Sequence, residues 1–320
     1  MRLLKLIPDN TKIDFVGARF YAFSIDGLLV LISLVSLFLH GLNLGIDFTG
    51  GVLMEVKAQQ SINIGQMRGK IDGLGFAEAQ LQYFGGGECE TPANSCVLIR
   101  VQPQANTNDQ QVAQKVQTAL GSGYVFRRTE VVGPKVSGEL LSAGVYATVI
   151  AVVMIAIYVA VRFEWQYGVG AIVATGHDVF VTAGLFSVLQ LDFTLTSVAA
   201  LLTLAGYSVN DTVVVFDRIR ENRRRYKRMS LRDLINTSTN QTLSRTVLTS
   251  GATAISIIPL LLFGGPTLFD FTAAILFGIV VGTYSSIYVA GALLIYLPPI
   301  VGPSTGAESA KAEVGAGASR

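Results

Sequence analysis

The sequence predicts a polytopic α-helical membrane protein with six transmembrane helices and one extracytoplasmic α+β domain of ferredoxin-like topology. The chain of 320 residues is 51% hydrophobic and only 14% charged, whereas soluble domains carry about 25% charged residues. Its mean hydropathy is +0.51. Six predominantly apolar runs approach or exceed the roughly 20 residues that a helix needs to cross a bilayer. This combination excludes an ordinary soluble globular protein.

The first span covers 21–42, directly after Arg19, with Asp26 near its cytoplasmic edge. We interpret it as an uncleaved signal anchor, because it is longer than the apolar part of a cleavable signal peptide and no small-residue cleavage site follows it. The rest of the bundle, residues 139–300, is expected to hold five further spans at 140–161, 166–190, 193–216, 246–267 and 271–300. Six spans place both termini on one side of the membrane.

The orientation follows from the lysine and arginine residues. They gather in the tail 1–20 and in the loop 217–245, and the short links near Leu191 and Leu268 contain none. Basic residues favour the cytoplasmic side, so both termini are predicted to be cytoplasmic. The basic loop is either a topology determinant on a solvated helix or a docking surface for a partner or anionic lipids. Within it, Ser230 precedes Asp233 by three residues, a pattern that predicts a helix start.

Residues 43–138 are therefore predicted to form a periplasmic domain. Strand-like alternation is expected at 51–57, 79–84, 97–101 and 125–132, and helical spacing at 64–74 and 109–120. This order of strand, helix, strand, strand, helix, strand predicts a ferredoxin-like sandwich. The tail 301–320 is rich in Gly, Ala and Ser and is predicted to be a disordered cytoplasmic segment.

Cys89 and Cys96 both fall in this external domain, with six residues between them. An oxidising compartment permits a disulfide there, and the alternative is two unpaired thiols. Such a short closed loop stabilises a fold by only about 2–3 kcal/mol in the chain-entropy model.

A carboxylate inside a predicted span costs at least ~2.5 kcal/mol on insertion scales, and two such acids, Asp211 and Asp178, stand out as candidates. Asp211 follows Tyr207 and Ser208 by about one helical turn, which places two hydroxyls near the acid. Asp178 lies beside His177 near the middle of the third span. These residues are candidates for a proton relay. The alternatives are a permanently paired acid at Asp211 and a packed core histidine at His177.

Arg245 stands at the cytoplasmic entry of the fifth span and supplies a candidate counter-charge for Asp211. It shares one helical face with Thr249, Thr253 and Ser256. Asp211 lies about as deep in its own span, so the two could meet. The alternative is an arginine that extends its charge to the membrane interface.

Several motifs resemble the SecD/SecF family of bacterial protein-export membrane subunits, and the likeness covers residues 12–300. The first is GIDFTGG at 45–51, which contains Gly45, Asp47, Phe48, Gly50 and Gly51. The others are VGP at 132–134, GHDV at 176–179, QTLSRT at 241–246 and the specific block GYSVNDTVVVFDRIREN at 206–222, which contains Asn210.

The resemblance implies half of an assembly of the resistance-nodulation-division (RND) type, paired with a SecD subunit beside the SecYEG channel. It implies work on a translocating preprotein, driven by the proton-motive force in the cytoplasmic membrane. Asp211 and Arg245 then match the family's proton-pathway acid and arginine. Protons are then the coupling ion, and no other cofactor is expected. Membrane lipids are expected as a further partner, and nucleic acid is not.

The residues alone are also compatible with a proton-driven exporter half for small molecules or lipids, or with a non-transporting membrane scaffold. An intramembrane enzyme is disfavoured, because the sequence has no metal triad, GxGD acid pair or serine-histidine dyad. Copurification with SecD and the channel would support export, whereas a homo-oligomer carrying lipid or drug would support the exporter.

The orientation can be tested by cysteine labelling in intact cells. We expect a single cysteine near Arg225 to be shielded from an impermeant thiol reagent and one within 43–138 to react. A cysteine near Arg225 that reacted from outside would reverse the predicted topology.

Overall fold

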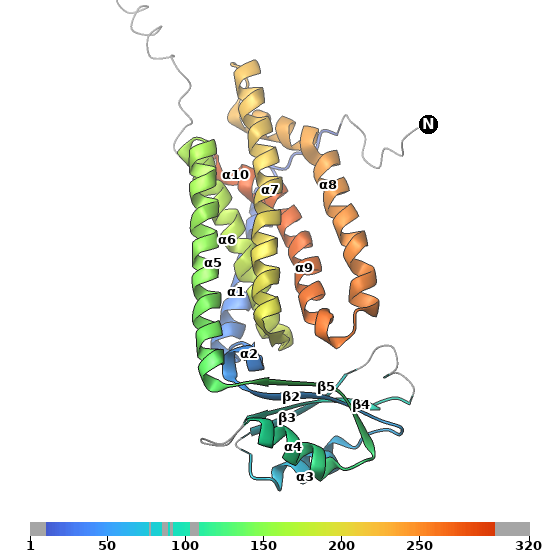
Figure 1. Cartoon of the computed structure of the whole chain (residues 1–320). Coiled ribbons are helices and arrows are strands. Elements are labelled where there is room, and N and C mark those ends of the chain that lie inside the picture. The colour runs from blue at the N-terminus through green and yellow to red at the C-terminus, as the bar shows by residue number, and fades with distance from the viewer. Residues whose placement is uncertain (1–10, 77, 85–88, 90–91, 103–108, 298–320) are drawn as a thin grey trace, which may run out of the picture.

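The computed structural model describes residues 11–76, 78–84, 89, 92–102 and 109–297. A bundle of long helices forms one layer, and a small α+β domain lies beneath one end of it (Figure 1). The predicted disordered tail 301–320 lies outside the described residues.

Six helices in the described part of the chain are long and apolar enough to cross a membrane, which confirms the predicted fold class. They are α1 (Arg19–Leu39), α5 (Pro134–Arg162), α6 (Trp165–Leu189), α7 (Leu195–Arg225), α8 (Leu231–Phe263) and α9 (Pro266–Ser285). A π-helical turn, Ser286–Ala290, and the short α10 (Gly291–Leu293) continue α9.

Two helices extend well beyond the apolar runs that predicted them. Helix α7 continues through the basic segment to Arg225, and its last turn carries three arginines that suit the negative end of a helix dipole. Helix α8 is a single helix of 33 residues. Its start agrees with the predicted cap, because the Ser230 side chain accepts a hydrogen bond from the backbone N–H of Asp233. Both polar extensions lie at the end of the bundle away from the α+β domain (Figure 1).

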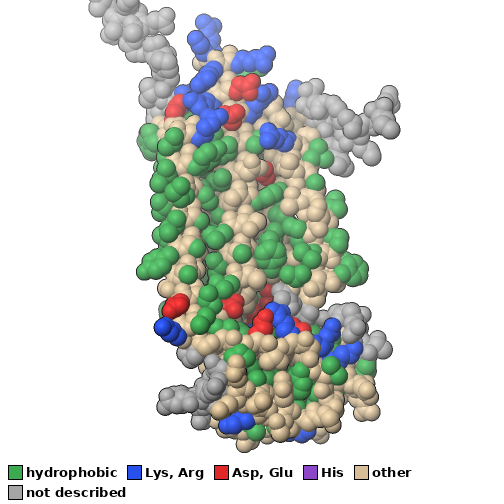
Figure 2. All heavy atoms as spheres, in the orientation of Figure 1, with side chains coloured by type: hydrophobic (Ala, Val, Ile, Leu, Met, Phe, Trp, Pro, Cys, Tyr) green, Lys and Arg blue, Asp and Glu red, His purple; other side chains and the backbone are tan. Residues whose placement is uncertain are grey.

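Apolar and basic side chains are also separated on the surface of the protein. In Figure 2, hydrophobic side chains cover the flank of the bundle, and Lys and Arg gather at the end opposite the domain. This distribution is the one expected of a lipid-facing girdle with a basic aqueous end.

The segment before α1 packs against the start of α8. The Asp14 carboxylate accepts hydrogen bonds from the Gly17 backbone at 2.8 Å, from Asn236 Nδ2 at 2.7 Å and from Arg232 Nη2 at 2.6 Å. These bonds, with that of Gly17 foremost, hold the pKa of Asp14 below its ordinary value. A lowered pKa means that the contact is intact at neutral pH and is lost only as the pH falls through that value.

The external domain has the predicted order of elements. These are β2 (Gly51–Ala58), α3 (Ile64–Asp72), β3 (Glu78–Tyr83), β4 (Cys96–Gln102), α4 (Asp109–Leu120) and β5 (Tyr124–Val132). The sheet is antiparallel with the order β3-β4-β2-β5, which is ferredoxin-like. Helices α3 and α4 cover the sheet face that points away from the bundle (Figure 1). Met54, Ile71, Val97 and Val116 are fully buried in the core between them.

A small second sheet, which the sequence did not predict, joins the domain to the bundle. Strand β1 (Asn43–Leu44) pairs in parallel with β6 (Asp192–Phe193), the link between α6 and α7. The short helix α2 (Ile46–Thr49) follows β1 and leads into β2. The chain leaving α1 is therefore fastened to the start of α7 before it enters the domain.

Helices α1 and α6 approach each other at Gly184. A Cβ added there would lie 2.1 Å from Ser33 Oγ and 2.9 Å from Ser33 Cα of α1. One turn away, the hydroxyls of Ser36 and Ser187 share a buried hydrogen bond of 2.8 Å. Small residues thus allow the backbones close enough for interhelical polar contact.

Replacing Gly184 tests this packing. Gly184→Ala should destabilise the detergent-solubilised protein by about 1–3 kcal/mol, because the methyl group cannot fit without moving a helix. Gly176→Ala is the matched control on the same helix, since nothing lies within 4 Å of its added Cβ. It should leave the denaturation midpoint unchanged or raise it slightly, because alanine favours helix. Equal midpoints for both variants would contradict the close α1–α6 contact.

Candidate functional site

Asp211 lies in the middle of α7 and is only 3% exposed. Ser250 of α8 donates a hydrogen bond from its hydroxyl to Asp211 Oδ2 at 3.4 Å. Ser250 in turn accepts hydrogen bonds from Tyr207 at 3.1 Å and from Thr283 of α9 at 2.7 Å. Tyr207 therefore reaches the acid through Ser250, and one network joins α7, α8 and α9 around the Asp211 carboxylate.

Arg245 lies on α8, five positions before Ser250, and is exposed. Among the residues that the structure describes, no ion pair joins its guanidinium to the Asp211 carboxylate. Arg245 and Ser250, the hydrogen-bond partner of Asp211, belong to the same helix α8. The direct meeting that the sequence suggested is therefore not seen in the described part of the chain, where the side-chain hydrogen-bond partner of Asp211 is the Ser250 hydroxyl.

Asp178 is fully buried and forms a second cluster. Its Oδ2 accepts hydrogen bonds from Ser208 of α7 at 2.5 Å and from Ser285 of α9 at 2.7 Å, and its Oδ1 lies 3.0 Å from His177 Nδ1. Ser208, which the sequence places near Asp211, donates to Asp178 instead. Thr182 bonds only to the backbone carbonyl of Asp178, at 2.8 Å.

The two clusters are neighbours along α7. Ser208 donates its hydroxyl to Asp178, and Asp211 follows Ser208 by three residues. One helical turn of α7 therefore takes part in both clusters. Asn210, between them in sequence, is exposed. A shift of α7 would change the surroundings of both carboxylates together.

The GIDFTGG motif explains how the external domain is held. Asp47 Oδ2 accepts a hydrogen bond of 2.9 Å from the backbone N–H of Leu195, the first residue of α7, where an acid also suits the helix dipole. The Gly45 N–H donates to Phe193 O at 2.8 Å. The Phe48 ring is buried, and its centroid lies 5.9 Å from that of Phe193.

The two glycines at the end of the motif have backbones that other residues rarely adopt. Gly50 has φ +74° and Gly51 has φ +119°. A Cβ on Gly51 would also lie 2.6 Å from the carbonyl oxygen of Val101 on β4. Both residues are needed where the chain turns from α2 into the central strand β2.

A cluster of polar contacts around Arg100 and Asp192, which sequence reasoning missed, reinforces this junction. Arg100 of β4 is 7% exposed and its Nη2 lies 2.6 Å from Asp192 Oδ2. Asn43 Nδ2 donates to the other Asp192 oxygen at 2.8 Å, and the Asp192 N–H donates to Asp270 Oδ2 of α9 at 3.1 Å. The only available signal was an arginine at the centre of an otherwise apolar strand.

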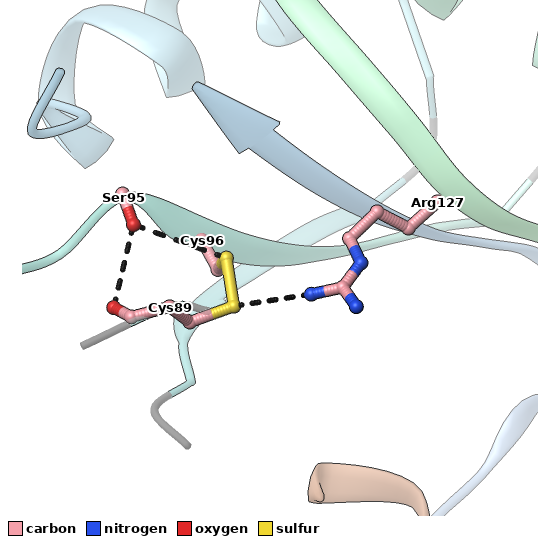
Figure 3. The surroundings of a disulfide bond; sticks show 4 residues. All are labelled: Cys89, Ser95, Cys96 and Arg127. Carbon is pink, nitrogen blue, oxygen red and sulfur yellow. Dashed lines mark hydrogen bonds between the residues drawn. A yellow bond between two sulfur atoms is a disulfide. The ribbon is translucent and has the colours of Figure 1, made fainter. Parts of the chain in front are cut away.

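The structure contains a disulfide between Cys89 and Cys96, with their Cα atoms 5.5 Å apart. Cys96 is the first residue of β4. Figure 3 shows Ser95 donating to the carbonyl of Cys89, at 3.3 Å, and Arg127 Nη1 approaching Cys89 Sγ at 3.5 Å. The bridge ties Cys89 to the first residue of β4.

Comparisons with known proteins place this arrangement in a family. Residues 111–298 match the family described as "Protein export membrane protein SecD/SecF, C-terminal", and residues 35–62 match the "SecD/SecF GG Motif". The chain therefore belongs to the SecD/SecF family, whose members are multi-pass membrane proteins of protein export.

Its relatives within this family are SecF subunits. The chain is 42% identical to the protein translocase subunit SecF of Cereibacter sphaeroides, covering 92% of each chain. It is 41% identical to SecF of Pseudomonas aeruginosa, covering 89% of this chain and 91% of the relative.

The fold also matches a solved structure. The crystal structure of SecDF, a translocon-associated membrane protein from Thermus thermophilus, superposes with a TM-score of 0.80 at 36% identity. The match covers 90% of this chain and 39% of the solved chain, so this chain spans well under half of that SecDF protein.

Removing the cap on α7 should loosen the junction. In Asp47→Ala the Leu195 N–H loses its acceptor, at a cost of about 0.5–2 kcal/mol for an N-terminal cap. We expect faster hydrogen-deuterium exchange at the first turn of α7. Asp72→Ala, at an exposed acid that ends α3, should leave this exchange unchanged. Unaltered exchange in Asp47→Ala would mean that Asp47 does not hold α7.

The disulfide can be tested by mass spectrometry of unreduced peptides, which should contain Cys89 and Cys96 linked. Replacing both by Ser should weaken the external domain by about 2–3 kcal/mol without abolishing its fold, because the closed loop is short. Two freely alkylated thiols under oxidising conditions would refute the bridge.

Proposed function

We propose that this chain is the SecF-type subunit of a proton-driven protein-export complex in the bacterial cytoplasmic membrane. It pairs with a SecD subunit beside the SecYEG channel and acts on a translocating preprotein, without enzymatic chemistry of its own. The family membership and the SecF names of its relatives support this proposal. The greater length of the solved SecDF chain supports a SecD half as the missing partner.

The orientation in this proposal has the basic ends of α7 and α8 in the cytoplasm and residues 43–138 in the periplasm. The arginines in the last turn of α7 and the basic end of the bundle in Figure 2 support it. The external domain then lies where an emerging preprotein would be met.

The observation that carries the proton-coupling part of the proposal is the buried Asp211 carboxylate, which has a single serine as its hydrogen-bond partner. A carboxylate that is desolvated and not locked to a cation can take up and release a proton. Protonation removes most of its attraction for Arg245 and converts it into a hydrogen-bond donor. The contact of α7 with α8 therefore differs between the two charge states, which is the differential interaction a conformational switch requires.

Helix α7 offers a direct route from this site to the external domain. Asp211 lies at its middle, and its first residue, Leu195, is held by Asp47 at the base of the domain. A movement of α7 would reach the domain through this bond and through the β1–β6 pair. Asp178 and Ser208, bonded across α6 and α7, are the second relay candidates on the same route.

The available energy is sufficient for such a switch. At a membrane potential of ~150 mV, one proton crossing the whole field releases about 3.5 kcal/mol. That energy changes the population ratio of two conformations of the bundle by a factor of roughly several hundred.

The test uses the complex with SecD reconstituted in vesicles with SecYEG. Asp211→Asn mimics the protonated acid permanently, so it should copurify with SecD normally and lose the proton-dependent part of preprotein export. Arg245→Met should do the same, because it removes the charge that responds to Asp211. Full proton-dependent export by Asp211→Asn would move the carrier role to Asp178.

The matched control is Asp217→Asn on the same helix. Asp217 is an exposed acid that pairs with Arg162 at 3.2 Å. Such an exposed pair contributes little, so export should stay close to that of the unmodified protein. Equal losses in the control and in Asp211→Asn would show that the assay responds to any change in α7.

A further inference from the structure

A third acid, Asp26 of α1, is buried without a hydrogen-bond partner. It is 6% exposed, and neither of its carboxylate oxygens has a partner among the described residues. Its Oδ1 lies 3.6 Å from Nε2 of His177 on α6, and that nitrogen also has no hydrogen-bond partner there. An isolated carboxylate in an apolar bundle is costly, so this arrangement requires an explanation.

The hydrogen bonds of Asp178 determine which protons His177 carries. Asp178 accepts from two serines on one oxygen and faces His177 Nδ1 with the other, which is the pattern of an ionised carboxylate. Nδ1 therefore carries a proton that it donates to Asp178. In the neutral imidazole Nε2 is then an acceptor. Without a further proton, this lone pair faces the Asp26 carboxylate, and two acceptors oppose each other.

One added proton resolves this conflict. It can lie on Nε2, as an imidazolium that donates to Asp26, or on Asp26, as an acid that donates to Nε2. In both forms the three groups carry one net negative charge, whereas without the proton they would carry two. We propose that Asp26 and His177 together form a proton-binding site, separate from Asp211, between α1 and α6.

Within the described residues, the groups around the pair provide no competing charge. From α9, Tyr284 donates its hydroxyl to the Ala22 carbonyl of α1 at 3.1 Å, and the Tyr288 ring of the π-helical turn packs on it at 5.2 Å. The other charged groups facing His177 are Asp178 and Asp26 themselves. Arg19, at the start of α1, directs its guanidinium to Val16 and Tyr296.

The site lies where it can control the attachment of α1. Helix α1 leads directly into β1 and the external domain, and α6 leads into β6. Binding of the proton holds Asp26 to His177 and so α1 to α6, whereas its loss makes the two helices repel. The consequence for export rests on the proposed function, but the proton site itself rests only on the geometry.

Histidine NMR in the SecD complex tests the site directly. The chain has two histidines, so His40→Gln leaves His177 as this chain's only imidazole, and labelling this subunit alone with ¹⁵N-histidine isolates its signal. We expect its Nε2 signal to change with pH as the shared proton is released. In Asp26→Asn the proton affinity of the site should fall about tenfold or more. The signal should then change at a pH lower by about one unit or more, or the change should disappear.

Two controls make the outcome decisive. Asp217→Asn changes an exposed acid and should leave the His177 signal as it was. Asp211→Asn should abolish proton-dependent export and leave the His177 titration in place, so failure of the proposed function would be seen separately. Normal copurification of Asp26→Asn with SecD confirms that the variant is folded. A His177 titration identical with and without the Asp26 carboxylate would overturn the proposal.

Discussion

Polar groups buried in this bundle must be satisfied by other groups of the bundle, because lipid offers no hydrogen bonds. Helix α7 supplies partners to several other helices. Ser208 satisfies Asp178 of α6, Tyr207 bonds to Ser250 of α8, and Thr212 shares a hydrogen bond with Ser286 beyond α9. The position of α7 therefore depends on polar contacts with several helices at once. A change in the charge of one acid alters a network rather than a single pair.

The end of α7 next to the α+β domain is also held by polar contacts. Its first turn is held by Asp47, and the strand before it pairs with β1. The Arg100–Asp192 ion pair is mostly buried, and such a pair contributes specificity of position more than stability. The domain is thus oriented against the bundle by directional bonds, which can transmit a displacement that apolar packing alone would absorb.

The sequence was sufficient for features that repeat along the chain. Apolar runs predicted the six spans, and alternation predicted each strand of the domain to within one or two residues. It could not predict contacts between distant segments. Asp192 looks like an ordinary surface charge in sequence, so nothing there pairs it with Arg100, and Ser208 has its partner on another helix. Helical spacing relates residues of one helix only, so it placed Ser208 beside Asp211, and it gave no reason to connect Asp26 with His177.

The polar face of α8 has a different character from the buried clusters. Thr249, Thr253 and Ser256 each donate a hydroxyl to the carbonyl four residues earlier, so this face costs little even against lipid. Arg245 is the exception, because a guanidinium has five N–H donors and cannot be satisfied by its own helix. Its exposure in this chain therefore favours a second surface that covers it in the membrane. The Asp211 carboxylate is already buried within this chain, so such a surface would cover Arg245 rather than the acid. The Asp26–His177 pair likewise lies between two helices of this chain, and these helices lead into the paired strands β1 and β6.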